Sequence, residues 1–275
     1  MPELRKKTTD TPLSPTCNDF AIAFIEPRCH PASEFVLRNL RLHAPSTPIV
    51  VVHGTKNEDF MKAITSKICG EFIYISSEAD DLPPPLYNAM LTSPKFWKRL
   101  QEISPWIIIA QSDSILLQNV DAIRPYIEKK YSFVGAPWSY TCSVCGAPMD
   151  GGCGHMIDQA IVAFLAPAMV GNGGFSLRNV ADMLQVLETH VGLPNPASKW
   201  PASSGVIPTG ATNEDVLFCK SLVMMEKPMP TRAEALEFCI EQVGPLEWRR
   251  GTPMAIACHK PWAYLHPGVV EAILN

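Results

Sequence analysis

The sequence predicts an α/β protein in which helices cover both faces of a mostly parallel central sheet. Three observations predict this fold class. From residue 20 onward, short apolar runs alternate with segments of helical periodicity, which is the pattern of strand–helix–strand units. The run at 106–111 is apolar almost throughout, as expected of a central strand buried on both faces. Hydrophobic residues make up 47% of the 275 residues, enough for one large core.

The first half of the chain contains strands separated by polar or proline-rich breaks. The strand at 20–25 ends in EPRCHP, the β-branched strand at 48–53 ends at Gly54, and three prolines precede the helix at 86–100. The predicted elements are strands 20–25, 48–53, 72–76 and 106–111 and helices 34–45, 60–68 and 86–100.

The second half is predicted to contain two long loops as well as regular elements. The loop at 138–157 is rich in Gly and Cys, and the loop at 192–212 is rich in Pro, Ser and Gly; such loops often build sites. The predicted elements are strands 132–134 and 174–177 and helices 180–190, 213–225 and 231–242. We expect one domain over 19–275 after a flexible leader at 1–18.

Composition argues against several classes of protein. The formal charge is −4 and basic residues are scattered, so no nucleic-acid partner is expected. No apolar run reaches the roughly 20 residues of a membrane span, and the N-terminus lacks the apolar stretch of a secretory signal. Nine cysteines, an odd number, favour the cytoplasm or another reducing compartment. A Golgi-type location stays open if the N-terminus is truncated.

Two clusters are candidates for binding a diphosphate and its cation. Asp113 follows the central strand at its carboxyl end, where ligands of parallel sheets gather, and a carboxylate there can hold a divalent cation. His259 and Lys260 add an imidazole nitrogen and an ammonium that can pair with phosphate. We expect Asp113 and His259 to meet in one pocket. The alternatives are that Asp113 caps a turn and that the His-Lys pair is surface decoration.

Two further segments are candidates for the rest of the site. Gly173 and Gly174 lack side chains, which allows another group to approach the backbone closely, although a tight turn is the alternative. Glu214 and Asp215 follow Asn213 at the start of a predicted helix, where capping alone would explain all three.

A cysteine-rich segment has the ligand types of a zinc site. Cys142, Cys145, Cys153 and His155 suit tetrahedral Zn²⁺, but their spacing matches no standard zinc module. Incidental thiols in a loop are the alternative interpretation.

Six segments read in order carry a family resemblance: EPRCHP with RN close behind, QSDSILLQN, VGAPW, GNGGFSLRN, NEDVLFC and HKPW. Over roughly residues 20–265 the chain resembles a family of uncharacterised glycosyltransferase-like proteins catalogued as a domain of unknown function. More distantly, it is similar to nucleotide-sugar transferases of the GT-A fold. The resemblance implies a GT-A-like, Rossmann-related three-layer α/β/α sandwich with a mostly parallel central sheet.

The resemblance also implies roles for single residues. Asp113 stands at the last acid of the D-x-D motif that binds Mn²⁺ or Mg²⁺, and His259 resembles the late metal-binding histidine. Gln111 replaces the first acid of that motif, so weak metal binding and catalysis without metal both stay open. The other implied roles are donor binding for Glu26, Arg28, Asp113, Gly173, Gly174 and Lys260, and base catalysis for Asp215 with Glu214 as second choice.

The implied activity is transfer of a sugar from a nucleoside-diphosphate-sugar, with UDP-sugars favoured, to a hydroxyl of a glycan or another acceptor. A base suggests inversion at the anomeric carbon, whereas the HKPW segment resembles retaining enzymes, so stereochemistry stays open. The main alternative is a non-catalytic protein of the same fold that binds nucleotide sugars or carbohydrate. A nucleotidyltransferase is disfavoured because no Gly-rich loop near the N-terminus precedes a basic residue.

Overall fold

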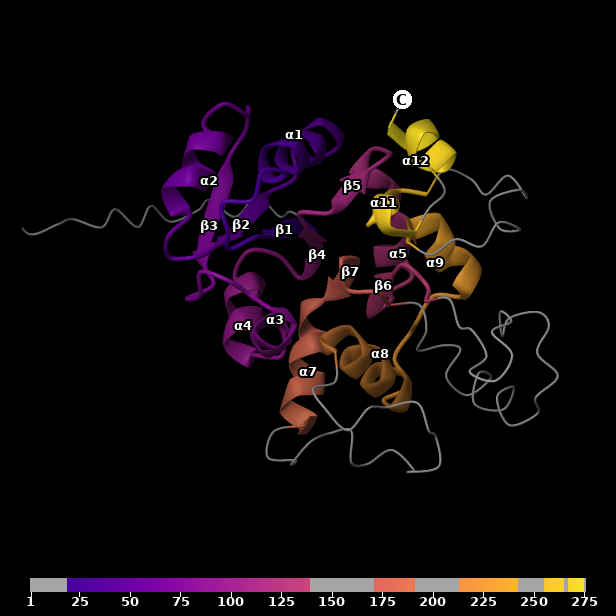
Figure 1. The fold of residues 1–275 in the computed structure, drawn as a ribbon. Coiled ribbons are helices and arrows are strands. Elements are labelled where there is room, and N and C mark those ends of the chain that lie inside the picture. Colours follow the sequence, from indigo (N-terminus) through magenta and orange to yellow (C-terminus); the bar gives the residue numbers. More distant parts are fainter. Residues whose placement is uncertain (1–18, 139–170, 191–212, 242–254, 265–266, 275) are drawn as a thin grey trace, which may run out of the picture.

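The computed structural model describes residues 19–138, 171–190, 213–241, 255–264 and 267–274, and its centre is a six-stranded sheet (Figure 1). The sheet has the order β3-β2-β1-β4-β7-β6. β1 to β4 run parallel, whereas β7 is antiparallel to both β4 and β6. The strands are β1 (Ala21–Ile25), β2 (Ile49–His53), β3 (Phe72–Ser76), β4 (Trp106–Gln111), β6 (Phe133–Gly135) and β7 (Phe175–Asn179). The mostly parallel sheet and the interior place of strand 106–111 are thus confirmed.

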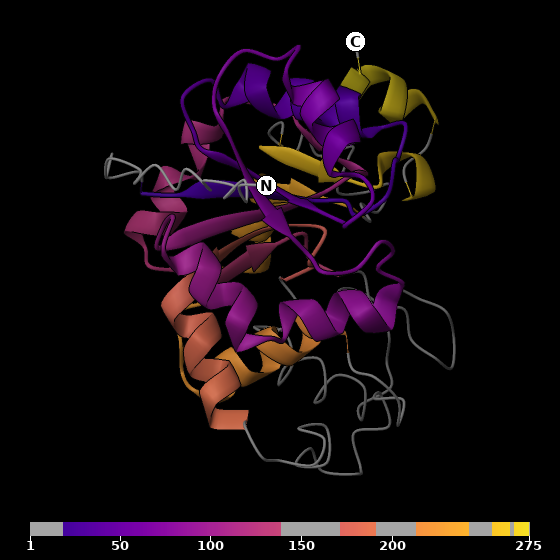
Figure 2. The ribbon, with the colours of Figure 1, turned by 90° about the vertical axis from the view of Figure 1, so that its left-hand side faces the viewer.

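Helices cover both faces of this sheet because side chains of each strand alternate between two cores. In β1, Ile22 and Phe24 pack in one core, whereas Ala21, Ala23 and Ile25 pack in the other. The two helical layers lie above and below the strands in Figure 2. The first core is covered by α1 (Ser33–His43), α2 (Glu58–Thr65), α5 (Arg124–Glu128) and α9 (Arg232–Phe238), and the second by α3 (Pro84–Leu91), α4 (Pro94–Gln101), α7 (Val180–His190) and α8 (Glu214–Met224).

A second, small sheet brings a late part of the chain to the end of β4. It has the order β5-β9-β8 and was not predicted from the sequence. Its strands are β5 (Ser114–Leu116), β8 (Cys239–Ile240) and β9 (Ala257–His259). β5 pairs antiparallel with β9, and Ser114 lies opposite His259. This register places His259 beside Asp113.

Three short helices complete the described part of the chain: η1 (Val120–Ile123), α11 (Pro261–Tyr264) and α12 (Pro267–Leu274). None of the helices within the described ranges is long and apolar enough to cross a membrane.

Two predicted helices differ from the structure. The helix expected at 86–100 is two helices, because Pro94 lacks an N–H and restricts Ser93, which is extended at φ −89° and ψ 122°. The helix expected at 231–242 ends at Phe238, where the chain enters β8. The predicted leader and, apart from Trp138, the two long loops lie outside the described residues. The assignment of residues 19–275 to one domain stays a prediction.

Candidate functional site

A cavity of about 350 Å³ opens at the carboxyl ends of β1 and β4. Ligands of open α/β sheets bind at such strand ends because the loops diverge there. Every residue predicted for the donor site, the metal and the base lines this cavity: Glu26, Arg28, Asp113, Gly173, Gly174, Glu214, Asp215, His259 and Lys260. The structure therefore brings together residues from both ends of the described chain, while their individual roles stay predictions.

Asp113 and His259 meet in the cavity, as expected. His259 Nε2 lies 3.2 Å from Asp113 Oδ1, and Lys260 Nζ lies 3.8 Å from Asp113 Oδ2. The Lys260 amide donates to the Asp113 carbonyl at 2.9 Å, which extends the pairing of β5 with β9. The His259 side chain is 2% exposed, so surface decoration is excluded for the imidazole. Lys260 has φ 48°, a left-handed conformation that is uncommon outside glycine and clusters at functional sites.

A buried carboxylate that sequence reasoning missed faces the other nitrogen of His259. Glu241 Oε1 lies 3.1 Å from His259 Nδ1, and the Glu241 side chain is 4% exposed. Burial lowers the pKa of His259, but Asp113 and Glu241 outweigh burial and raise it. Burial also raises the pKa of Asp113, but His259 and Lys260 outweigh it and lower the pKa. Asp113 is therefore an anion at neutral pH. In the sequence, the only sign that Glu241 is buried was its position directly after the apolar residues Cys239 and Ile240.

The donor atoms around Asp113 fit a hard divalent cation. Asp113 Oδ1 is buried and accepts no well-aligned hydrogen bond from any residue that the structure describes. Gln111 Oε1 lies 3.2 Å from His259 Nε2, so an amide oxygen stands beside the carboxylate and the imidazole. Carboxylate and amide oxygens suit Mn²⁺ or Mg²⁺, whereas an imidazole nitrogen is a softer ligand that transition metals accept more readily than Mg²⁺. Among the described residues, no group of three His, Cys, Asp or Glu side chains is placed to hold a metal, so a site here would need the amide oxygen of Gln111 as a further donor.

Glu26 and Arg28 form a rigid pair at the end of β1. Arg28 donates from Nε and Nη2 to the two Glu26 oxygens at 2.7 and 2.9 Å, and Ser112 Oγ donates to Glu26 Oε2 at 2.7 Å. Burial raises the pKa of Glu26, but these hydrogen bonds outweigh it and lower the pKa. Because the Glu26 oxygens are occupied and the Arg28 side chain is 54% exposed, Arg28 is the member able to meet an anionic ligand.

The two glycines lie in a bend of the chain and allow close packing there. Neither has φ in the left-handed region. A Cβ at Gly174 would lie 2.1 Å from His259 Nε2, and a Cβ at Gly173 would lie 2.4 Å from Glu214 Oε1. Gly174 therefore makes room for the imidazole, and Gly173 makes room for the acidic pair.

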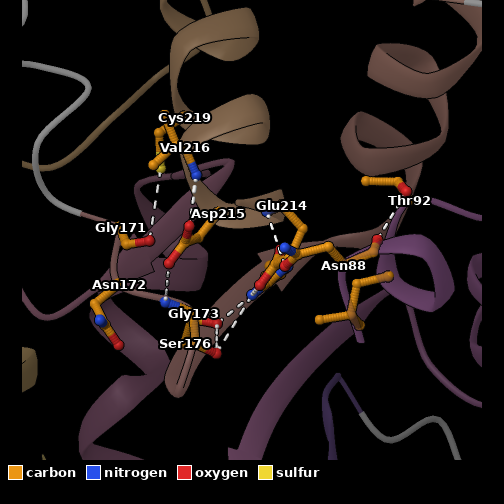
Figure 3. Close-up of polar contacts among 12 residues, drawn as sticks. Asn88, Thr92, Gly171, Asn172, Gly173, Ser176, Glu214, Asp215, Val216 and Cys219 are labelled. Atoms are coloured by element: carbon orange, nitrogen blue, oxygen red, sulfur yellow. Dashed lines mark hydrogen bonds and ion pairs between the residues drawn. The ribbon is translucent and has the colours of Figure 1, made fainter. Parts of the chain in front are cut away.

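The acidic pair begins α8, and Figure 3 shows how it meets the glycine segment. The Asn213 side chain makes no capping hydrogen bond, so the capping interpretation is wrong for that residue. Asp215 Oδ2 accepts from the Gly173 amide at 3.0 Å, and Asp215 Oδ1 accepts from the Val216 amide at 2.7 Å. Burial and the neighbouring Glu214 raise the pKa of Asp215 to about 7. Asp215 is thus poised to gain or lose a proton at neutral pH.

Glu214 has a different environment from Asp215. Its two oxygens accept from Arg178 Nη1 and Nη2 at 2.6 and 3.0 Å. Arg178 is fully buried on β7 and was not singled out from the sequence. An arginine directly after the predicted strand 174–177 was the signal available.

The predicted zinc ligands Cys142, Cys145, Cys153 and His155 lie outside the described residues. The cysteines that the structure does describe, which are Cys29, Cys69, Cys219, Cys239 and Cys258, are all free thiols.

Comparisons with known proteins agree with this architecture. A family profile described as "Protein of unknown function (DUF5672)" matches residues 84–259, which include Asp113, Asp215 and His259. No curated protein matches the sequence. The chain is similar to the apo crystal structure of mouse xyloside xylosyltransferase 1 at 12% identity and a TM-score of 0.58, covering 90% of this chain and 100% of that chain.

The apo structure of WbbM, a bifunctional glycosyltransferase, is also similar, at 10% identity and a TM-score of 0.52. The match covers 90% of this chain and 46% of WbbM, so the chain spans less than half of that protein. Likeness at these identities concerns the fold alone, and it confirms the predicted GT-A-like architecture.

Proposed function

The chain belongs to the DUF5672 family of proteins of unknown function, and we propose that it is a glycosyltransferase acting on a nucleoside-diphosphate-sugar and a hydroxyl acceptor. One observation carries the proposal. A single cavity, at the strand ends of a fold shared with glycosyltransferases, contains both cationic groups for a diphosphate and a carboxylate with a pKa near neutrality.

The donor diphosphate is assigned to the part of the cavity around Asp113. Arg28 and Lys260 offset phosphate charge as the nucleotide departs. Asp113 and His259, with Gln111 beside them, would hold Mn²⁺ or Mg²⁺. The cation would neutralise the diphosphate in the ground state and the leaving group. A UDP-sugar is the first donor to test.

Asp215 is assigned as the base that accepts the proton of the acceptor hydroxyl. As the hydroxyl oxygen attacks the anomeric carbon and the bond to the nucleoside diphosphate breaks, the Asp215 carboxylate takes the hydroxyl proton. The partial burial of Asp215 and its pKa of about 7 suit that role, because a base works best when its pKa is close to the ambient pH. This direct displacement inverts the anomeric carbon, and the anomeric configuration of the product tests it.

A two-stage experiment tests the function. UDP-, GDP- and CMP-sugars are first screened by thermal shift with and without Mn²⁺, where a ligand at 100 times its Kd adds about 2.7 kcal/mol to the free energy of unfolding. Donors that bind are then tested for transfer and hydrolysis. We expect Asp215→Asn to bind donor normally but to transfer about 10² to 10⁴ times more slowly. Asp113→Ala should lose the metal-dependent shift, and Asp121→Asn on the exposed surface is the matched control.

Two outcomes decide against the proposal. If nucleotide sugars bind but none is hydrolysed or transferred, the protein is a nucleotide-sugar binding protein, an interpretation that the amide of Gln111 in place of an acid favours. If no nucleotide sugar binds, the cavity has another ligand.

A further inference from the structure

A buried arginine lies beneath the acidic pair and has no part in the roles assigned above. Arg178 is fully buried among three aromatic rings, with its guanidinium carbon 4.4 Å from the Phe133 centroid and 5.8 Å from those of Trp97 and Phe218. Burial of a charge costs stability unless the charge is paired, so this position requires compensation by specific partners.

The hydrogen bonds of Arg178 connect it to residues that line the cavity. Besides the two bonds to Glu214, its Nε donates to Ser176 Oγ at 2.9 Å and its Nη2 donates to the Gly173 carbonyl at 3.4 Å. Gly173 in turn donates its amide to Asp215. The guanidinium, the glycine and the two carboxylates are therefore one connected network.

From this network we infer that Arg178 is a positioning residue of the proposed transfer reaction. It binds Glu214 so that Glu214 does not accept the proton, and Asp215 is the carboxylate that accepts it. The inference rests on the proposed function. A bidentate pair with a guanidinium occupies both Glu214 oxygens, whereas the Asp215 oxygens accept only amide N–H groups among the described residues.

The charges around Asp215 give this inference a measurable consequence. In the described part of the chain, the titratable groups that face Asp215 are Glu214, Arg178, Tyr87 and Cys219. Glu214 raises the pKa of Asp215, and Arg178 lowers it. Removal of the Glu214 charge should therefore lower the pKa of Asp215, and subsequent removal of Arg178 should raise it again.

The experiment is a ¹³C NMR titration of aspartate-labelled protein, with the Asp215 signal assigned by its loss in Asp215→Asn. We expect Glu214→Gln to lower the pKa of Asp215 by about one pH unit or more. In the double variant Arg178→Met/Glu214→Gln the pKa should return upward by a similar amount. Lys227→Met, which breaks the Lys227–Asp182 pair outside the cavity, should leave it unchanged. The inference is overturned if the pKa of Asp215 does not change in Glu214→Gln. It is also overturned if adding Arg178→Met to that variant does not change the pKa of Asp215.

Transfer assays separate this inference from the proposed function. Glu214→Gln should retain transfer, with the acid limb of its pH profile moved to lower pH, whereas Asp215→Asn should not. If Glu214→Gln is too unstable, the double variant, which leaves no buried charge unpaired, should still transfer within about tenfold of the wild type. Loss of transfer in a folded variant that lacks only the Glu214 carboxylate overturns the inference. The NMR titration needs no substrate, so it gives its answer even if no sugar is transferred.

Discussion

Gly174→Ala should weaken metal binding at the site proposed around Asp113 and His259, while leaving the rest of the cavity intact. The new Cβ would lie 2.1 Å from His259 Nε2, whereas ordinary contacts begin at 3.4 Å, so the imidazole must move by more than an ångström. It cannot move easily, because Glu241 lies on its other side and β9 is held by β5. Metal–ligand distances keep within about 0.2 Å of their standard values, so a shift of this size takes the imidazole out of range. We therefore expect Mn²⁺ affinity to fall by about 10- to 100-fold or more, about 1.4–2.8 kcal/mol.

Mn²⁺ binding is measured by electron paramagnetic resonance of the free ion and by thermal shift with UDP. Gly173→Ala is the matched control, because its Cβ would meet Glu214 at 2.4 Å rather than His259. Both variants should lose about 1–3 kcal/mol of stability through overpacking. Gly173→Ala should keep its Mn²⁺ affinity but slow transfer, because its Cβ would also lie 3.2 Å from the Cβ of Asp215, the proposed base. The reasoning is refuted if folded Gly174→Ala binds Mn²⁺ as tightly as the wild type.

Three further outcomes are expected. The rate of transfer should fall about tenfold per pH unit below the Asp215 pKa of about 7, because the base must be ionised, and a pH-independent rate between pH 5 and 8 would exclude Asp215 as the base. Glu241→Gln should weaken Mn²⁺ binding about 10-fold or more by releasing the His259 ring, and unchanged calorimetric affinity would contradict that role. Asn57→Ala should raise the KM for the donor more than it lowers kcat, because Asn57 Nδ2 donates to the Glu26 and Arg28 carbonyls; an effect on kcat alone would contradict this.

The sequence predicted the parallel part of the sheet well because β1, β2 and β4 are largely apolar runs followed by polar or helix-breaking residues. The position of Asp113 in the cavity could also be predicted, because Asp113 lies two residues after the end of β4 and parallel strands end at one edge of a sheet. It did not predict the β5–β9 pairing, because the local pattern of a short strand does not indicate which distant strand pairs with it.

The partners of the predicted residues were also beyond sequence reasoning. Glu241 and Arg178 act through contacts with residues far away in the chain, and no local pattern encodes such pairs. Glycine spacing was informative, but which atoms approach Gly173 and Gly174 depends on how α8 and β9 pack.

The pairing of β5 with β9 has a consequence for how the protein matures. Gln111 and His259 are 148 residues apart, and contacts at such separation form late because much chain entropy is lost in closing the loop. The parallel strands β1 to β4 can assemble earlier from nearer neighbours. A chain that stops before β9 would thus carry Asp113 without its imidazole partner, and its cavity would lack both His259 and Lys260.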